Sequence, residues 1–222
     1  MPVRVLRFFA PDRGKLEQVY GTDRMEFHRS VFLSGLGRFF AAMLIVVHLV
    51  VMFPGTSFLD TDTKLWLAPF VAGIVALMFG AAWLVEHGHH AASRLLTNGT
   101  IAVSTMGSVI FCGGFVASHA TPFLIAPIVV AFCISPPREA VIWGTATFTI
   151  PLVLDLMLRS LGISLPDYTS QSSETANAIF LMGTLFITVS MSLTYLQRIY
   201  RELHETLTQS AKSIKHGQRR TR

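Results

Sequence analysis

The sequence predicts an all-α, polytopic membrane protein, a six-transmembrane-helix bundle followed by a C-terminal coiled coil. Of the 222 residues, 51% are hydrophobic and only 14% are charged, whereas soluble domains carry about a quarter charged residues. The apolar residues gather in blocks close to the roughly 20 residues that a helix needs to cross a bilayer. A seam of apolar residues at heptad spacing follows the last block.

Six apolar blocks can be recognised along the chain. The fourth is short, so it predicts a thin or steep helix. The first begins only after about thirty charge-rich residues and no small-residue cleavage site follows it, so we interpret it as a retained helix and not as a signal peptide. The blocks span residues 31–53, 65–85, 95–117, 122–134, 140–161 and 178–196.

Lys and Arg residues predict the orientation of the chain. Of the 18, six precede the first block, seven follow the last, and Arg94 and Arg138 lie in the second and fourth connections. The other three connections hold only Lys64 and Arg159. Because cytoplasmic loops are rich in Lys and Arg, both termini are predicted to be cytoplasmic. Arg38, about two turns into the first helix, joins Arg94 and Arg138 as an expected inner-surface anchor.

The stretch ISPPREAV, residues 134–141, is predicted to form a tight cytoplasmic turn between two membrane helices. Ser135 is expected to cap the helix that follows. Prolines are tolerated in a first helical turn, and Glu139 favours the positive end of the helix dipole. The polar residues of this stretch therefore require no catalytic role.

The segment after the sixth block repeats apolar side chains at steps of three and four. This spacing predicts one continuous helix that leaves the membrane and pairs with a second copy of the chain. An amphipathic helix on the membrane surface is the alternative. Nucleic-acid binding is disfavoured, because topology already explains the basic excess. The predicted homodimer seam contains Leu196, Tyr200, Leu203, Leu207 and Ile214.

Ionisable residues inside apolar blocks are candidates for function, because charge is costly in lipid. His48, His119 and Asp155 all fall at the predicted outer side of the membrane, and Arg159 follows Asp155 by four residues. We predict that they converge on an outward-facing ligand-binding pocket. Two alternatives remain: a local ion pair between Asp155 and Arg159, and a packing role for His48.

Other residues with chemical potential are interpreted structurally. Pro127 and Pro151 are expected to break their helices beside the outer pocket. The cluster EHGHH, residues 86–90, is interpreted as a solvated loop, because its spacing matches no closed zinc pattern. Cys112 and Cys133 lie inside apolar blocks and are interpreted as packing residues.

Patterns typical of membrane enzymes are missing from the sequence, including a nucleophile loop, an aspartate pair, H-E-x-x-H and a phosphate-binding loop. We therefore expect no catalytic residue, no metal and no cofactor. A small transporter or permease-like protein, with a path at His48, His119 and Asp155, and an assembly subunit are the rival interpretations.

The order of these features resembles the six-helix membrane sensor domains of bacterial signalling proteins. The resemblance is carried by GGFVASHATP leading into LIAPIVVAF, the inner turn with Arg138, the opening AVIWG, and a sixth helix that runs into heptads. Such domains precede class III adenylyl cyclases, sensor histidine kinases and diguanylate cyclases. The resemblance implies a homodimeric receptor of the bacterial inner membrane that detects a small hydrophobic ligand or an outer-face signal.

The resemblance also implies a division of the chain and a missing partner. It divides into a cytoplasmic or interfacial segment (1–30), a transmembrane sensor domain (31–196), a cytoplasmic coiled-coil signalling helix (197–216) and a basic tail (217–222). Because only HGQRRTR follows Lys215, we expect no enzymatic activity in this chain. A kinase or cyclase output domain is expected either further along the same polypeptide, beyond the 222 residues of this sequence, or as a separate cytoplasmic partner.

Overall fold

The structure is a computed structural model. Within the residues that it describes, helices form all the regular secondary structure and no strand occurs, which confirms the predicted all-α class. Those residues are 11–52, 61–111, 113–116, 118, 121–163, 165, 185–190, 192–197, 199–201, 204–205 and 208.

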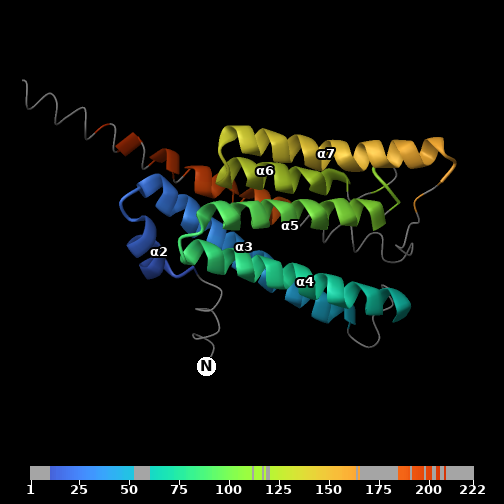
Figure 1. Ribbon diagram of the computed structural model, residues 1–222, viewed down its shortest axis with the longest axis horizontal. Coiled ribbons are helices and arrows are strands. Elements are labelled where there is room, and N and C mark those ends of the chain that lie inside the picture. Colours follow the sequence, from blue (N-terminus) through green and yellow to red (C-terminus); the bar gives the residue numbers. More distant parts are fainter. Residues whose placement is uncertain are drawn as a thin grey trace, which may run out of the picture.

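The helices run back and forth along one common direction (Figure 1). After α7, short helical stretches continue between residues 185 and 208 and are called the last helix. The other elements are α2 (Arg13–Tyr20), α3 (Arg24–Met52), α4 (Thr61–Glu86), α5 (His90–Phe111), η1 (Thr121–Leu124), α6 (Ile125–Ile134) and α7 (Pro137–Ser160).

Three of the described helices are long and apolar enough to cross a membrane: Arg24–Val46, Ala68–Glu86 and Pro137–Ser160. This is consistent with a membrane protein, but the described residues do not reach the predicted count of six. Thr121–Ile134 is apolar and too short, and the start of the sixth block lies outside the described residues. The helix α5 is long enough, but its buried side chains include several polar ones, among them Ser93, Thr97, Asn98, Thr100 and Thr105.

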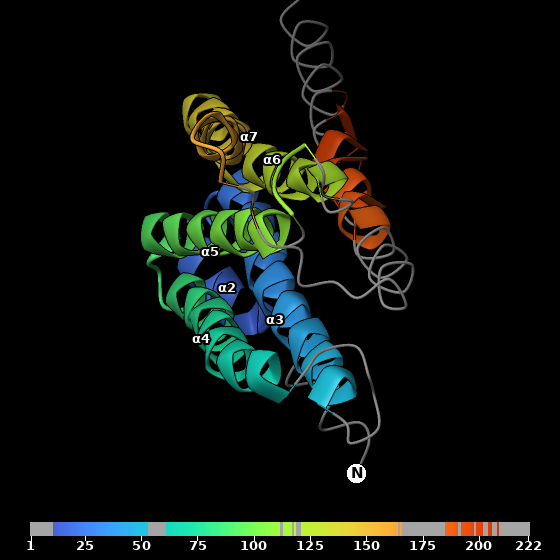
Figure 2. The same cartoon turned by 90° about the vertical axis from the view of Figure 1, so that its right-hand side faces the viewer.

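The helix α5 lies at the centre of the bundle and contacts α3, α4, α6 and α7. The pair α3 and α4 lies on one side of it and the pair α6 and α7 on the other (Figures 1 and 2). Small residues allow the close approach within a pair. A Cβ added at Gly37 would lie 2.8 Å from the carbonyl oxygen of Met78. The backbone of α3 at Gly37 therefore packs directly against the backbone of α4 at Met78.

One end of the bundle, here called the α2 end, holds α2, the start of α3 and the connections from α4 to α5 and from α6 to α7 (Figure 1). The short helix α2 is part of the core, because Leu16 is fully buried beside α3 and α4 residues such as Leu33 and Val85. The chain passes beyond the bundle at this same end through the last helix (Figure 1).

The turn between α6 and α7 forms where it was predicted, but its capping differs. Ser135 ends α6, its hydroxyl accepts a hydrogen bond from the side-chain amide of Asn98 at 2.7 Å, and the N-cap of α7 is Pro136. The predicted helix breaks are also wrong. Pro127 falls in the first turn of α6, where no backbone donor is needed, and α7 continues through Pro151.

Candidate functional site

Asp155 is buried, with 1% of its surface exposed, near the C-terminal end of α7, and this end of the helix lies opposite α2 (Figure 1). Its Oδ1 accepts a hydrogen bond from Arg159 Nε at 2.9 Å, and its Oδ2 accepts one from the backbone N–H of Val116 at 2.9 Å. The alternative of a local ion pair is therefore confirmed. Through its hydrogen bond with Val116, the same carboxylate also connects the loop after α5 to α7.

The loop beneath Asp155 depends on a glycine. Gly114 has φ +89°, a conformation that L side chains rarely adopt, and a Cβ there would lie 2.6 Å from Asp155 Oδ1. Only glycine brings the backbone this close to the carboxylate.

The described residues do not assemble the predicted outer pocket. His119 lies outside them. His48 belongs to α3, on the other side of α5 from α7 (Figure 2), and its buried Nδ1 has no hydrogen-bond partner among the described residues. Of the three predicted ligand-binding residues that the structure describes, it thus pairs Asp155 with Arg159.

Two of the three predicted anchors form ion pairs between helices of the bundle. Arg38 Nη2 lies 2.6 Å from Glu86 Oε1, which also accepts a hydrogen bond from the Ser34 hydroxyl at 2.7 Å. Arg94 Nη2 lies 3.0 Å from Glu139 Oε1. These partners join α3 to α4 and α5 to α7, contacts that the anchor prediction did not include. Arg138 is exposed, and its anchoring role stays a prediction.

The histidine cluster is only partly the solvated loop that was predicted. Residues 87–89 are exposed, but Glu86 is buried and His90 lies 3.3 Å from Glu26 Oε2. Burial lowers the pKa of His90, with smaller contributions from neighbouring charges, of which Glu26 raises it and Arg94 lowers it. Within the described part of the chain, no group of His, Cys, Asp and Glu side chains could hold a metal ion.

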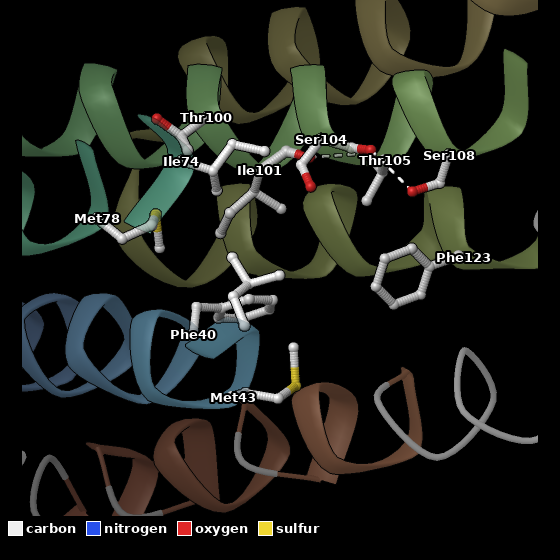
Figure 3. A pocket seen from close by; sticks show the side chains of 11 residues that line it. Phe40, Met43, Ile74, Met78, Thr100, Ile101, Ser104, Thr105, Ser108 and Phe123 are labelled. Atoms are coloured by element: carbon white, nitrogen blue, oxygen red, sulfur yellow. Dashed lines mark hydrogen bonds between the residues drawn. The ribbon is translucent and has the colours of Figure 1, made fainter. Parts of the chain in front are cut away.

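A pocket with a cavity volume of about 80 Å³ lies between α3, α4, α5 and η1 (Figure 3). Apolar side chains form most of its wall and no charged residue lines it. Four hydroxyl residues of α5 form the rest. Its lining residues are Phe40, Met43, Leu44, Ile74, Met78, Thr100, Ile101, Ser104, Thr105, Ser108 and Phe123.

The last helix packs against α3 and α6. The rings of Phe32 and Tyr195 are stacked with centroids 4.2 Å apart, and Cys133 Sγ lies 4.0 Å from the carbonyl oxygen of Ser192. Leu196 and Tyr200, from the predicted dimer seam, are exposed. The other seam residues, Leu203, Leu207 and Ile214, lie outside the described residues.

Sequence reasoning missed the pocket between α3, α4 and α5. The signal that could have found it is the spacing of Thr100, Ser104 and Ser108, which places three hydroxyls on one helix face.

Comparison with known proteins adds no further assignment, since no protein-family model, curated protein or solved structure matches the chain.

Proposed function

We propose that the chain is the membrane-embedded sensor module of a bacterial signalling receptor. In this proposal a lipophilic signal binds in the pocket between α3, α4 and α5, and the last helix passes the change to a cytoplasmic output domain with kinase or cyclase activity. Three helices that are long and apolar enough to cross a membrane, the apolar pocket and the packing of the last helix support it.

The proposal includes six crossings, with both termini in the cytoplasm. Beyond the three apolar spans, α5 and the short helix Thr121–Ile134 lie packed among them, and they are proposed to share the membrane because their neighbours cover them. The last helix supplies the sixth crossing. The α2 end then faces the cytoplasm, in agreement with the Lys and Arg residues of both terminal segments.

The observation that carries the proposal is that α3 serves two contacts. Phe40, Met43 and Leu44 of α3 form one wall of the pocket, while Phe32 of the same helix stacks on Tyr195 of the last helix. Phe32 and Phe40 are eight residues apart, about 12 Å along the helix axis. A ligand that favours one position of α3 therefore shifts the last helix as well.

Dimerisation through the last helix completes the proposed mechanism. Leu196 and Tyr200 are 41% and 77% exposed, so two members of the heptad seam are free to meet a second copy. Paired helices of this kind have a small number of packing arrangements. A shift of the paired last helices from one arrangement to another would therefore transmit the signal to the output domain.

Spin labels on the last helix test this proposal. The full chain, with Cys112 and Cys133 replaced by Ala and Leu196 replaced by a labelled Cys, is placed in lipid nanodiscs, and distances between copies are measured with and without octanol. We expect a defined intermolecular distance that octanol changes. The variant Ile101→Phe, which fills the pocket, serves as the control and should abolish the response. The absence of an intermolecular distance, or a distance that octanol leaves unchanged, would contradict the proposal.

A further inference from the structure

Resting on the proposed sensor function, we infer the chemical class of the ligand. We propose that the pocket binds the end of an unbranched alkyl chain of a neutral molecule, and that Ser104 forms a hydrogen bond with a single uncharged oxygen group of that molecule.

The lining of the pocket excludes a charged ligand. None of its 11 side chains is ionisable. The charged residues Arg38 and Arg159, on two of the neighbouring helices, are already paired with Glu86 and Asp155. An ion that entered would lose its hydration without gaining a counter-charge, at a cost of several kcal/mol. A neutral molecule avoids this cost.

The size of the pocket favours a slender chain over a ring. Its volume is about 80 Å³, about half of the roughly 150 Å³ in an apolar engineered cavity that admits benzene. A few methylene groups fit such a space. Met43 of α3 and Met78 of α4 both line the pocket, and unbranched methionine side chains adapt to the bends of a flexible chain.

Two of the four α5 hydroxyls, those of Thr100 and Ser104, form no hydrogen bond with the described residues, and that of Thr100 points away from Phe40 and Phe123 (Figure 3). The hydroxyls of Thr105 and Ser108 donate to the carbonyl oxygens of Ile101 and Ser104, at 2.9 and 3.0 Å, so their protons are occupied. The Ser104 hydroxyl forms no hydrogen bond with the described residues and points from α5 into the space between Phe40 and Phe123 (Figure 3). A ligand oxygen at this point satisfies a hydroxyl that is otherwise unpaired.

Water is a poor occupant of this pocket. A buried water molecule typically makes about three hydrogen bonds. Here the walls are mostly apolar and offer one unpaired hydroxyl toward the space between the two rings.

The two remaining sources of an alkyl chain are a free neutral amphiphile, which we propose, and an acyl chain of a bilayer phospholipid.

Photolabelling of the full chain in nanodiscs distinguishes these occupants. Three diazirine probes of matched chain length are compared: an octanol derivative, the corresponding octane derivative, and a phospholipid with the diazirine on its acyl chain. Labelled residues are then mapped by mass spectrometry. We expect the alcohol to label the pocket residues of α3 and α5 in preference to the alkane, and unlabelled octanol to compete.

Variants distinguish the contribution of the Ser104 hydrogen bond to ligand binding from the contribution of the pocket's shape. Ser104→Ala should keep labelling by the alkane and lower the preference for the alcohol about threefold, the equivalent of about 0.6 kcal/mol for a hydrogen bond between membrane helices. Ser104→Thr should keep the preference. Ile101→Phe should remove pocket labelling, because Ile101 is 3% exposed, whereas Val103→Phe on the lipid-facing side, where Val103 is 55% exposed, should leave it unchanged.

Three results would overturn the inference. Labelling that persists in Ile101→Phe would place the ligand elsewhere, an unchanged preference in Ser104→Ala would remove the role of that hydroxyl, and phospholipid labelling that octanol cannot displace would identify a bilayer lipid as the occupant. Photolabelling reports binding alone. Binding without any change in the spin-label distances would therefore contradict the sensor proposal while leaving the ligand assignment intact.

Discussion

Phe32 of α3 and Tyr195 of the last helix stack face to face, with ring centroids 4.2 Å apart and an angle of 19° between the ring planes. The Tyr195 hydroxyl is buried and has no hydrogen-bond partner among the described residues. The contact therefore depends on the two ring faces and not on the phenol oxygen.

We expect Phe32→Ala to destabilise the chain by about 3–5 kcal/mol, because the side chain is 8% exposed and its removal leaves a cavity beneath Tyr195. Tyr195→Phe should be neutral or stabilising, since it removes a buried hydroxyl without a partner. Unfolding by titration with a denaturing detergent measures both changes. Phe186→Ala, on the same helix but 73% exposed, is the control. A large loss in Tyr195→Phe would contradict the role given to the ring stack.

The ion pair between Arg38 and Glu86 should behave as a buried pair. Glu86→Gln is expected to lower the free energy of unfolding by about 3–5 kcal/mol, because it leaves the Arg38 guanidinium beside a neutral amide. The double variant Arg38→Met with Glu86→Gln should recover much of this loss. Glu17→Gln, on the exposed face of α2, is the matched control. Equal losses in the single and double variants would show that the two residues act independently.

The stability of the chain should fall on acidification through His90. Burial holds the pKa of His90 below its ordinary value of 6.5, so the unfolded chain binds the proton more readily than the folded chain. The stability that the neutral His90 side chain contributes is fully present above pH 6.5, and it is lost as the pH falls from 6.5 to the pKa of His90 in the folded chain. His90→Gln should reduce the pH dependence in this window, measured as the free energy of unfolding between about pH 7.5 and 5. The exposed His87→Gln is the control, and a reduction no larger than in that variant would refute the assignment.

Two glycines allow a matched test of the Asp155 contact. Gly114→Ala should cost more than Gly162→Ala, although both residues have positive φ, at +89° and +73°. A Cβ at Gly162 meets nothing within 4 Å, so that variant reports the backbone strain alone, about 1–2 kcal/mol. The additional loss in Gly114→Ala measures the displacement of the Asp155 carboxylate. Similar losses in both variants would show that the carboxylate adapts freely.

The helices themselves were largely predictable, because long apolar runs have few alternatives to a helix. The predicted blocks at 65–85 and 140–161 correspond closely to α4 and α7. The block at 31–53 begins too late, since α3 starts at Arg24. The carboxylate of Asp23 accepts hydrogen bonds from the backbone N–H groups of Met25 and Glu26, and this cap begins the helix inside the charged segment.

The contacts between helices were far less predictable. A helix that is apolar on every side gives no periodic pattern, because lipid and neighbouring helices are equally apolar. The sequence could therefore not show that Arg38 turns toward Glu86, 48 residues away. The pair of Asp155 and Arg159 could be predicted from the sequence because both residues lie on one helix. The additional hydrogen bond from Val116 could not, because it depends on the position of a loop 39 residues earlier.

The central position of α5 has a consequence for biogenesis. Its polar side chains, such as Asn98 and Thr105, are hidden by the surrounding helices, so a nascent α5 without those helices would present them to lipid acyl chains. Under the proposed topology we therefore expect α5 to enter the bilayer as a hairpin with α4 and to remain poorly inserted until α6 and α7 have been synthesised. Truncations that end after Phe111 should then be prone to extraction and degradation, even though they already contain two of the three helices that are long and apolar enough to cross a membrane.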